Sequence, residues 1–177
     1  MIEFASAWTA TQRNLRRERV RRDHVTAAAC QRVSRLRVAA AGAFAAAVWT
    51  AQEPLDRRVF GHPYSDPMFL GKAITRGRGW RVAGVTWHLA NGALFALAVD
   101  TLARRTGRDP RRLALQLALA ENTVLYPVTI LTDRYHPARD DPGVAPLWHP
   151  RAFAQATWRH ALFGWLVGRL ASAERHA

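Results

Sequence analysis

Four apolar stretches limit what this chain can fold into, because each is close to the length of a membrane-spanning helix. They lie at about 36–53, 82–103, 113–132 and 152–171. A helix needs about 20 mostly apolar residues, within a range of roughly 17 to 25, to cross the hydrocarbon core of a bilayer. The pattern therefore predicts an all-α fold, a four-helix transmembrane bundle formed by residues 36–171.

Basic residues are distributed unevenly between the connections of this expected bundle. The chain has 26 Lys and Arg residues against 13 Asp and Glu residues. Sixteen of the basic residues lie in the first 37 residues, in the connection RRTGRDPRR and at the C-terminal end from Arg169 onward, whereas nine lie in the other two connections. Because cytoplasmic loops carry an excess of Lys and Arg, we expect an inner-membrane protein with both termini in the cytoplasm.

The segment before the first apolar stretch, residues 1–35, is rich in arginine that alternates with Val, Leu and Ala. This pattern predicts an amphipathic helix in the cytoplasm or along an anionic lipid surface, and residues 172–177 form a short tail. The segment lacks the early apolar core of a cleaved secretory signal. No aromatic-interleaved basic strand or zinc-finger spacing is present, so the expected partner is the lipid bilayer and nucleic acid is not favoured.

A soluble helical bundle rich in Ala and Arg is the alternative fold, and the mean hydropathy of −0.18 favours it. Two observations favour the membrane bundle. A soluble bundle has no reason to place arginine in alternate connections. Trp49, Trp80 and Trp148 also fall at or just beyond the expected outer ends of the spans, where tryptophan prefers the membrane interface.

The second and fourth stretches share a His-x3-Gly-x3-small pattern. It comprises His88, Gly92 and Ala96 in one and His160, Gly164 and Gly168 in the other. Small residues four positions apart lie on one helical face and let membrane helices pack closely. The pattern predicts helix packing through these faces, within a homo-oligomer or a larger membrane complex, and suggests a 2+2 internal repeat.

Polar side chains within the apolar stretches are expected to meet in one layer. They are His88, Asn91, Glu121, Asn122 and His160. Ionisable residues inside a membrane are costly and often functional. The layer could relay protons, or His88 and His160 could hold a haem from two helices. The alternative is purely structural, with Glu121 pairing with Arg159 or His160 to hold the helices together.

The connections on the expected outer side contain His-Pro and Asp-Pro steps, in GHPYSDP and in DRYHPARDDPGVAPLWHP. Imidazole and carboxylate groups suit a divalent metal ion. The candidate ligands are His62, Asp66, His136, Asp140, Asp141 and His149. The alternative is that these steps only shape turns, because proline restricts the backbone of the residue before it.

The run AGAFAAAVWTAQEPLDRR and the ending HALFGWLVGRL resemble the YagU-like bacterial inner-membrane proteins of unknown function. The matching features are the Glu-Pro-Leu step at residues 53–55 and a last span of His, Gly and aromatic residues that runs into arginine. The resemblance implies a four-span inner-membrane protein and no known reaction. The long basic N-terminus departs from that family's pattern.

No hydrolase, nucleotide-binding or dinucleotide-binding motif is present. The sequence therefore favours a non-enzymatic role in the membrane, in binding, transport assistance or complex assembly, that uses the polar layer. The alternative is a membrane enzyme or redox carrier with a haem at His88 and His160 or a divalent metal ion at the outer loops.

Overall fold

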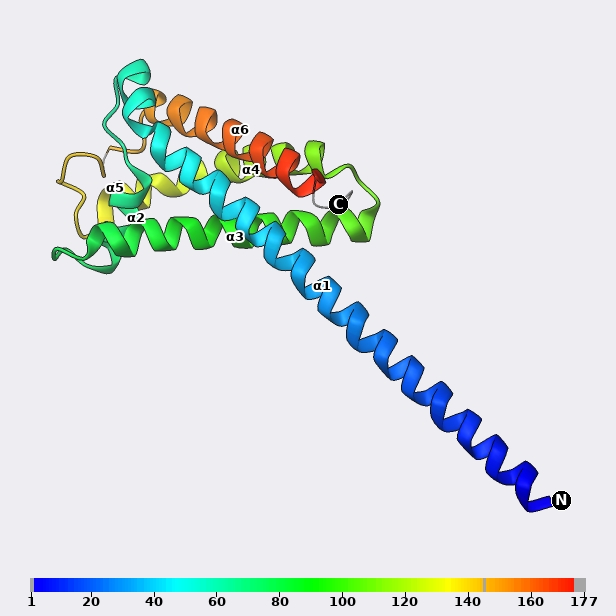
Figure 1. Cartoon of the computed structure of the whole chain (residues 1–177). Coiled ribbons are helices and arrows are strands. Elements are labelled where there is room, and N and C mark those ends of the chain that lie inside the picture. Colours follow the sequence, from blue (N-terminus) through cyan, green and yellow to red (C-terminus); the bar gives the residue numbers. More distant parts are fainter. Residues whose placement is uncertain (1, 145, 174–177) are drawn as a thin grey trace. The chain divides into compact units, whose positions relative to one another are not determined.

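The computed structural model describes residues 2–144 and 146–173, with the side chains of residues 26, 31, 32 and 34 onward. These residues contain helices and no strand, so the all-α fold is confirmed (Figure 1). The elements are α1 (Ile2–Phe60), α2 (Asp66–Ile74), α3 (Trp80–Thr106), α4 (Pro110–Leu125), the 3-10 turn η1 (Tyr126–Val128), α5 (Thr129–Tyr135) and α6 (Pro150–Ala173).

The chain forms two units, Met1–Leu36 and Arg37–Ala177. The first unit is the N-terminal part of α1, and it is helical, as expected for the basic segment. Most of its side chains lie outside the described residues, as do residues 174–177 of the predicted tail. The amphipathic character of residues 1–35 therefore stays a prediction.

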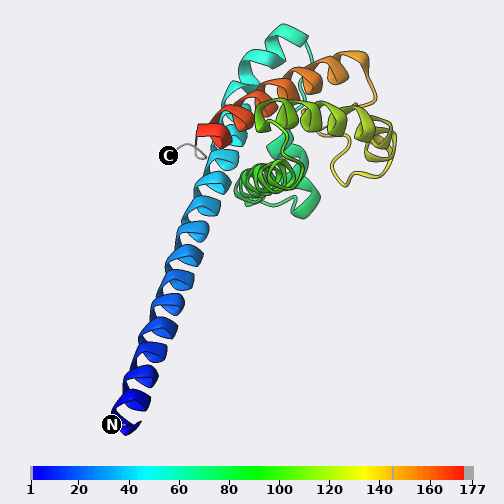
Figure 2. The same ribbon diagram turned by 90° about the vertical axis from the view of Figure 1, so that its right-hand side faces the viewer.

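In the second unit, α6 packs along α4, and α2 packs against α3 (Figure 2). A tight connection joins α3 to α4, because Gly107 adopts a left-handed backbone with φ of 67° that favours glycine. Asp109 then caps α4, and its Oδ1 atom accepts a hydrogen bond of 3.0 Å from the backbone N–H of Arg111. Pro110 fits the first position of the helix because that position needs no N–H donor.

The other connections of the second unit gather at the opposite end from this turn (Figure 1). The end of α1, all of α2, the end of α5, the loop residues 136–144 and 146–149, and the beginning of α6 lie there together. The site described below is built from these segments.

Glycine allows the long helices to approach closely at two places. A Cβ atom on Gly92 of α3 would lie 2.6 Å from the carbonyl oxygen of Gly42 in α1, and one on Gly164 of α6 would lie 2.9 Å from the Cβ atom of Ala118 in α4. Gly168 meets the backbone of Arg111 in the same way. The small-residue faces are thus occupied within one chain, so a homo-oligomer would have to use other surfaces.

Small apolar residues form the centre of the second unit. The core cluster includes Ala45, Ala46, Ala96, Ala114 and Ala118. Its larger members are Val38, Trp49, Val99, Phe163 and Val167. Alanine and glycine at the contacts keep the helix axes close.

Two segments, Trp80–Thr106 and Pro110–Tyr135, are long and apolar enough to cross a membrane. Most residues of both segments are exposed rather than buried in the structure. A core helix of a soluble protein would pass the same test of length and composition, but it would be mostly buried. The four-span arrangement is a finer claim and is argued under the proposed function.

The glycine contact between α1 and α3 gives a test of this packing. Gly92→Ala adds a methyl group where the backbone of Gly42 already stands, so we expect the free energy of unfolding to fall by about 1–3 kcal/mol. For a chain of this length the thermal midpoint then drops by several degrees. Gly79→Ala is the matched control, because a Cβ atom there meets nothing within 4 Å. Equal midpoints for both variants would contradict the close approach.

Candidate functional site

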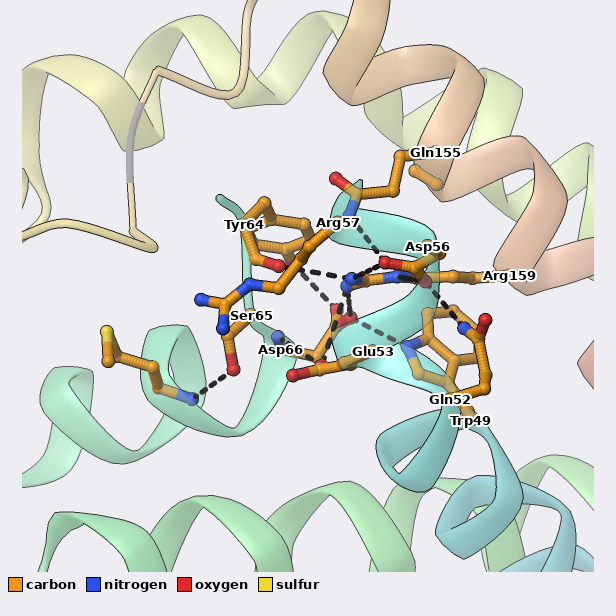
Figure 3. Close-up of polar contacts among 12 residues, drawn as sticks. Trp49, Gln52, Glu53, Asp56, Arg57, Tyr64, Ser65, Asp66, Gln155 and Arg159 are labelled. Carbon is orange, nitrogen blue, oxygen red and sulfur yellow. Dashed lines mark hydrogen bonds and ion pairs between the residues drawn. The ribbon is translucent and has the colours of Figure 1, made fainter. Parts of the chain in front are cut away.

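A fully buried arginine, Arg159 of α6, stands at the centre of a group of three carboxylates (Figure 3). Its Nε and Nη2 atoms donate to the two carboxylate oxygens of Asp56 at 2.6 and 2.7 Å, which is a two-point bond. Its Nη1 atom donates to Asp66 at 2.6 Å and lies 3.5 Å from Glu53 Oε1. We call Arg159, Asp56, Asp66 and Glu53 the ion cluster.

Local structure places these carboxylates on both sides of the connection between α1 and α2. Glu53 and Asp56 are three residues apart near the end of α1, so they share one helical face. Asp66 begins α2, where Ser65 is the N-cap and accepts a hydrogen bond from the backbone N–H of Met68. The backbone N–H of Asp66 also donates to Glu53 at 3.0 Å, which fixes the two segments together.

A second group of side chains satisfies the remaining oxygens of the ion cluster (Figure 3). Asp66 accepts hydrogen bonds of 2.7 Å from Trp49 Nε1–H and from the Tyr64 hydroxyl. Asp56 accepts bonds of 2.6 Å from the amides of Gln52 and Gln155. Buried charges need this degree of pairing, because removing them from water costs several kcal/mol each.

Burial and the charges of the ion cluster shift the pKa values of Asp66 and Tyr64 in the α1–α2 connection. Burial is the largest single influence on the pKa of Asp66 and would raise it. The charge of Arg159, the nearby His88 and the hydrogen bonds from Tyr64 and Trp49 together outweigh burial and lower that pKa below the ordinary value. Burial, together with the neighbouring Asp66 carboxylate, raises the pKa of the Tyr64 hydroxyl well above its usual range. Asp66 is therefore ionised and Tyr64 is a neutral donor at ordinary pH.

His88 and His160, the histidines of the expected haem site, both contact Trp49. The ring centroids lie 5.2 and 4.8 Å from that of Trp49, edge to face. Both imidazoles that a haem would need as axial ligands therefore pack against the same indole. The side chains present do not fit a haem held in this way.

The expected polar layer forms only in part. Asn122 is buried and donates a hydrogen bond of 2.9 Å from Nδ2 to Thr157 across the α4–α6 contact. His88 is buried and His160 partly buried, whereas Asn91 and Glu121 are exposed. The suggested Glu121–Arg159 pair is wrong, because Arg159 is fully engaged by carboxylates of α1 and α2.

The six candidate metal ligands of the outer loops lie in separate sets of contacts. The His62 and His149 rings stack at 5.6 Å, and burial together with His149 lowers the pKa of His62 below its ordinary value. Both nitrogens of His136 face backbone partners, the Phe69 carbonyl and the Ala138 amide.

The three carboxylates of that candidate set are also separated. Asp66 belongs to the ion cluster, Asp141 pairs with Lys72, and Asp140 is largely exposed beside Arg139. Across the part of the chain that the structure describes, no group of three or more His, Cys, Asp or Glu residues could hold a metal ion.

A cavity of about 270 Å³ lies beside the ion cluster, between α4, η1, α5, the loop and α6. Its apolar walls include Phe69, Leu125, Tyr126, Val128, Leu147 and Ala156. Its polar lining consists of Tyr64, Glu121, Asn122, Thr129, Thr132 and His160. Tyr64 joins the two regions, because its ring lines the cavity and its hydroxyl bonds Asp66.

Residues 146–149, just before α6, are held against α5 and η1 by several contacts. Both carboxylate oxygens of Asp133 accept a hydrogen bond from the backbone N–H of Leu147, and one also accepts from Trp148. The Trp148 ring stacks on Tyr126 with centroids 4.6 Å apart. These contacts hold Leu147 and Tyr126 in the cavity wall.

The sequence analysis missed the ion cluster although its signal was present. An arginine inside an apolar helix needs a carboxylate partner at a similar depth. Arg159 lies within the first three turns of α6, and Glu53 and Asp56 lie within the last two turns of α1 at the same end of the bundle. A comparison of how far each residue lies from the end of its helix would have favoured Glu53 and Asp56 over Glu121 as partners of Arg159.

Comparison of the chain with protein-family models, curated proteins and solved structures gives no match. The resemblance to the YagU-like proteins therefore stays a prediction. What can be said of function rests on the ion cluster, the cavity and the surface around them.

The ion cluster predicts a large effect for one substitution. Arg159→Met leaves three carboxylates buried without their cation, so we expect the free energy of unfolding to fall by about 3–5 kcal/mol. Arg159→Lys keeps the charge but loses the two-point bond, so its loss should be smaller. Arg151→Met, at an exposed arginine of the same helix, is the control. Thermal unfolding of purified protein measures all three, and a wild-type midpoint for Arg159→Met would refute this role.

Proposed function

We propose that this chain is a helical membrane protein that binds a lipophilic small molecule in the cavity beside the ion cluster. The observation that carries the proposal is a cavity with largely apolar walls. It lies between the buried ion cluster and the exposed apolar surface of the helices. The proposal has two parts, the position in the bilayer and the binding of a ligand, and each has its own support.

The distribution of side chains supports a position in the bilayer. Arg159, Gln155 and Asp56 are among the most buried side chains, whereas many large apolar residues are exposed. Exposed members include Phe44 of α1, Leu94 of α3, Val124 of α4 and Trp165 of α6. Water would penalise so many exposed apolar groups, whereas lipid would accept them and favour charges that are paired inside.

Four spans, rather than two, are supported by the ion cluster itself. The second half of α1 and α6 have fewer apolar residues than α3 and α4 partly because they carry Glu53, Asp56, Gln155 and Arg159. Those groups face one another in the interior, so they do not meet lipid. The exposed residues at positions 38–60 of α1 and in α6 are mostly apolar. The exposed arginines of these segments lie near the helix ends and are Arg58, Arg151 and Arg169. The excess of arginine in alternate connections agrees with cytoplasmic termini.

The binding function is supported by the cavity's size and lining. Small-molecule sites are concave, mostly apolar and furnished with a few polar groups, with volumes of about 300–1,000 Å³. A cavity of about 270 Å³ falls just below this range and suits a small, slender ligand. A ligand that dissolves in the bilayer could reach such a site from the lipid.

Binding is favoured over catalysis by the state of the polar groups. The carboxylates and the guanidinium of the ion cluster bond one another and their neighbours, so they act as a clamp between helices. Neither the haem nor the metal alternative is supported by the contacts of the histidines.

Filling the cavity tests the binding function. Ala156 lines the cavity from α6, so Ala156→Trp should abolish the binding of radiolabelled decanol to protein in phosphatidylcholine nanodiscs, after subtraction of empty nanodiscs. Thr132→Phe fills the cavity from α5 and should also weaken binding. Ala154→Trp is the control, because Ala154 is exposed on α6. Unchanged binding in both filled variants, or no decanol binding by the native chain, would contradict the proposed function.

A further inference from the structure

The charge of the cavity lining is opposite to that of the chain. The chain has a formal net charge of +13, yet no Lys or Arg is found among the described residues that line the cavity. Glu121 is the lining residue with a carboxylate, and it is also exposed, which places it at the rim. A cation entering the cavity would meet a carboxylate and no basic side chain in the walls.

In the part of the chain that the structure describes, the carboxylate of Glu121 has no hydrogen-bond donor or cation paired with it. It lies in the middle of the predicted third span, where an unpaired carboxylate is costly. A positively charged ligand group would remove that cost.

The inner polar groups of the cavity are also acceptors. Nδ1 of His160 lies 2.8 Å from the carbonyl oxygen of Ala156, which only accepts, and in the tautomer in which Nδ1 donates this bond Nε2 is an acceptor. Asn122 donates its amide N–H to Thr157, which leaves its Oδ1 atom as an acceptor. The set of free acceptors therefore matches a ligand that donates hydrogen bonds.

Aromatic side chains add a third feature that suits a cation. Phe69, Tyr126 and Tyr64 line the cavity. The guanidinium of Arg159 already lies 5.2 Å from the Tyr64 ring centroid, which shows a cation accommodated by this ring. Aromatic faces attract cations more strongly where water is excluded.

We propose that the ligand is a lipophilic amine in its protonated form, with its ammonium group beside Glu121 and its apolar chain against Leu125, Val128 and Leu147. Asn122 Oδ1 and His160 Nε2 accept hydrogen bonds from the ammonium group. This inference rests on the proposed function and specifies the chemical class of its ligand. The net positive charge of the chain opposes nonspecific binding of such a cation, so selective uptake would have to come from the cavity.

Competition between two probes of equal chain length tests the inference. Decylammonium and decanol are used to displace radiolabelled decanol from the full chain in phosphatidylcholine nanodiscs, whose zwitterionic lipid gives no net attraction for cations. We expect decylammonium to bind more tightly than decanol. Glu121→Gln should weaken decylammonium binding about fivefold, a size expected for a partly exposed ion pair, and leave decanol binding unchanged.

The control is Asp140→Asn, which removes a largely exposed carboxylate outside the cavity lining and should affect neither probe. Equal or tighter binding of decanol, or an equal loss of both probes in Glu121→Gln, would overturn the ammonium ligand but leave the proposed function standing. Absence of decanol binding by the native chain would instead overturn the proposed function.

Discussion

The bond between Arg159 and the two aspartates of the α1–α2 region is the interaction on which the rest of this structure depends. It ties α6 to segments about one hundred positions earlier in the chain. An arginine buried without partners would be very costly, so α6 has a strong preference for the position in which Asp56 and Asp66 surround it. Helix packing through glycine and alanine brings the helices close, and the ion cluster selects the register and the end at which they meet.

Both regions of the proposed site use the same helix. Gln155 and Arg159 lie on the face of α6 that meets the ion cluster, while Ala156 and His160, each one position later, line the cavity. Spacing of four residues keeps each pair on its own face. The ion cluster therefore also fixes the helix that forms one wall of the cavity. Tyr64 contacts both regions, because its hydroxyl bonds Asp66 and its side chain lines the cavity. If the proposed ligand binds here, stability and binding are coupled through this end of the bundle.

Periodicity and composition were sufficient to predict the helical fold, because long apolar stretches separated by Gly, Pro and Arg leave few other structures. The role of Gly92 and Gly164 also followed from spacing, although the partners proved to lie within the chain. Long-range pairing was harder to predict. Nothing local shows that Arg159 meets Asp56 rather than Glu121, or that Trp49 packs against both His88 and His160. The six outer His and Asp residues shared a loop composition, but their contacts depend on how α2 and the loop 136–149 fold over the bundle.

The most direct test of a charged interior inside an apolar exterior is the solvent exposure of single sites in lipid. Cys30 is the only cysteine, so a Cys30→Ser background allows spin labels at Phe44, Leu94, Val124 and Trp165, one for each predicted span, with Asp140 as the loop control. In phosphatidylcholine vesicles, the account predicts that the four apolar sites collide often with oxygen and rarely with a water-soluble nickel chelate, while Asp140 shows the reverse. Ready access of the nickel chelate to the four apolar sites would contradict the account.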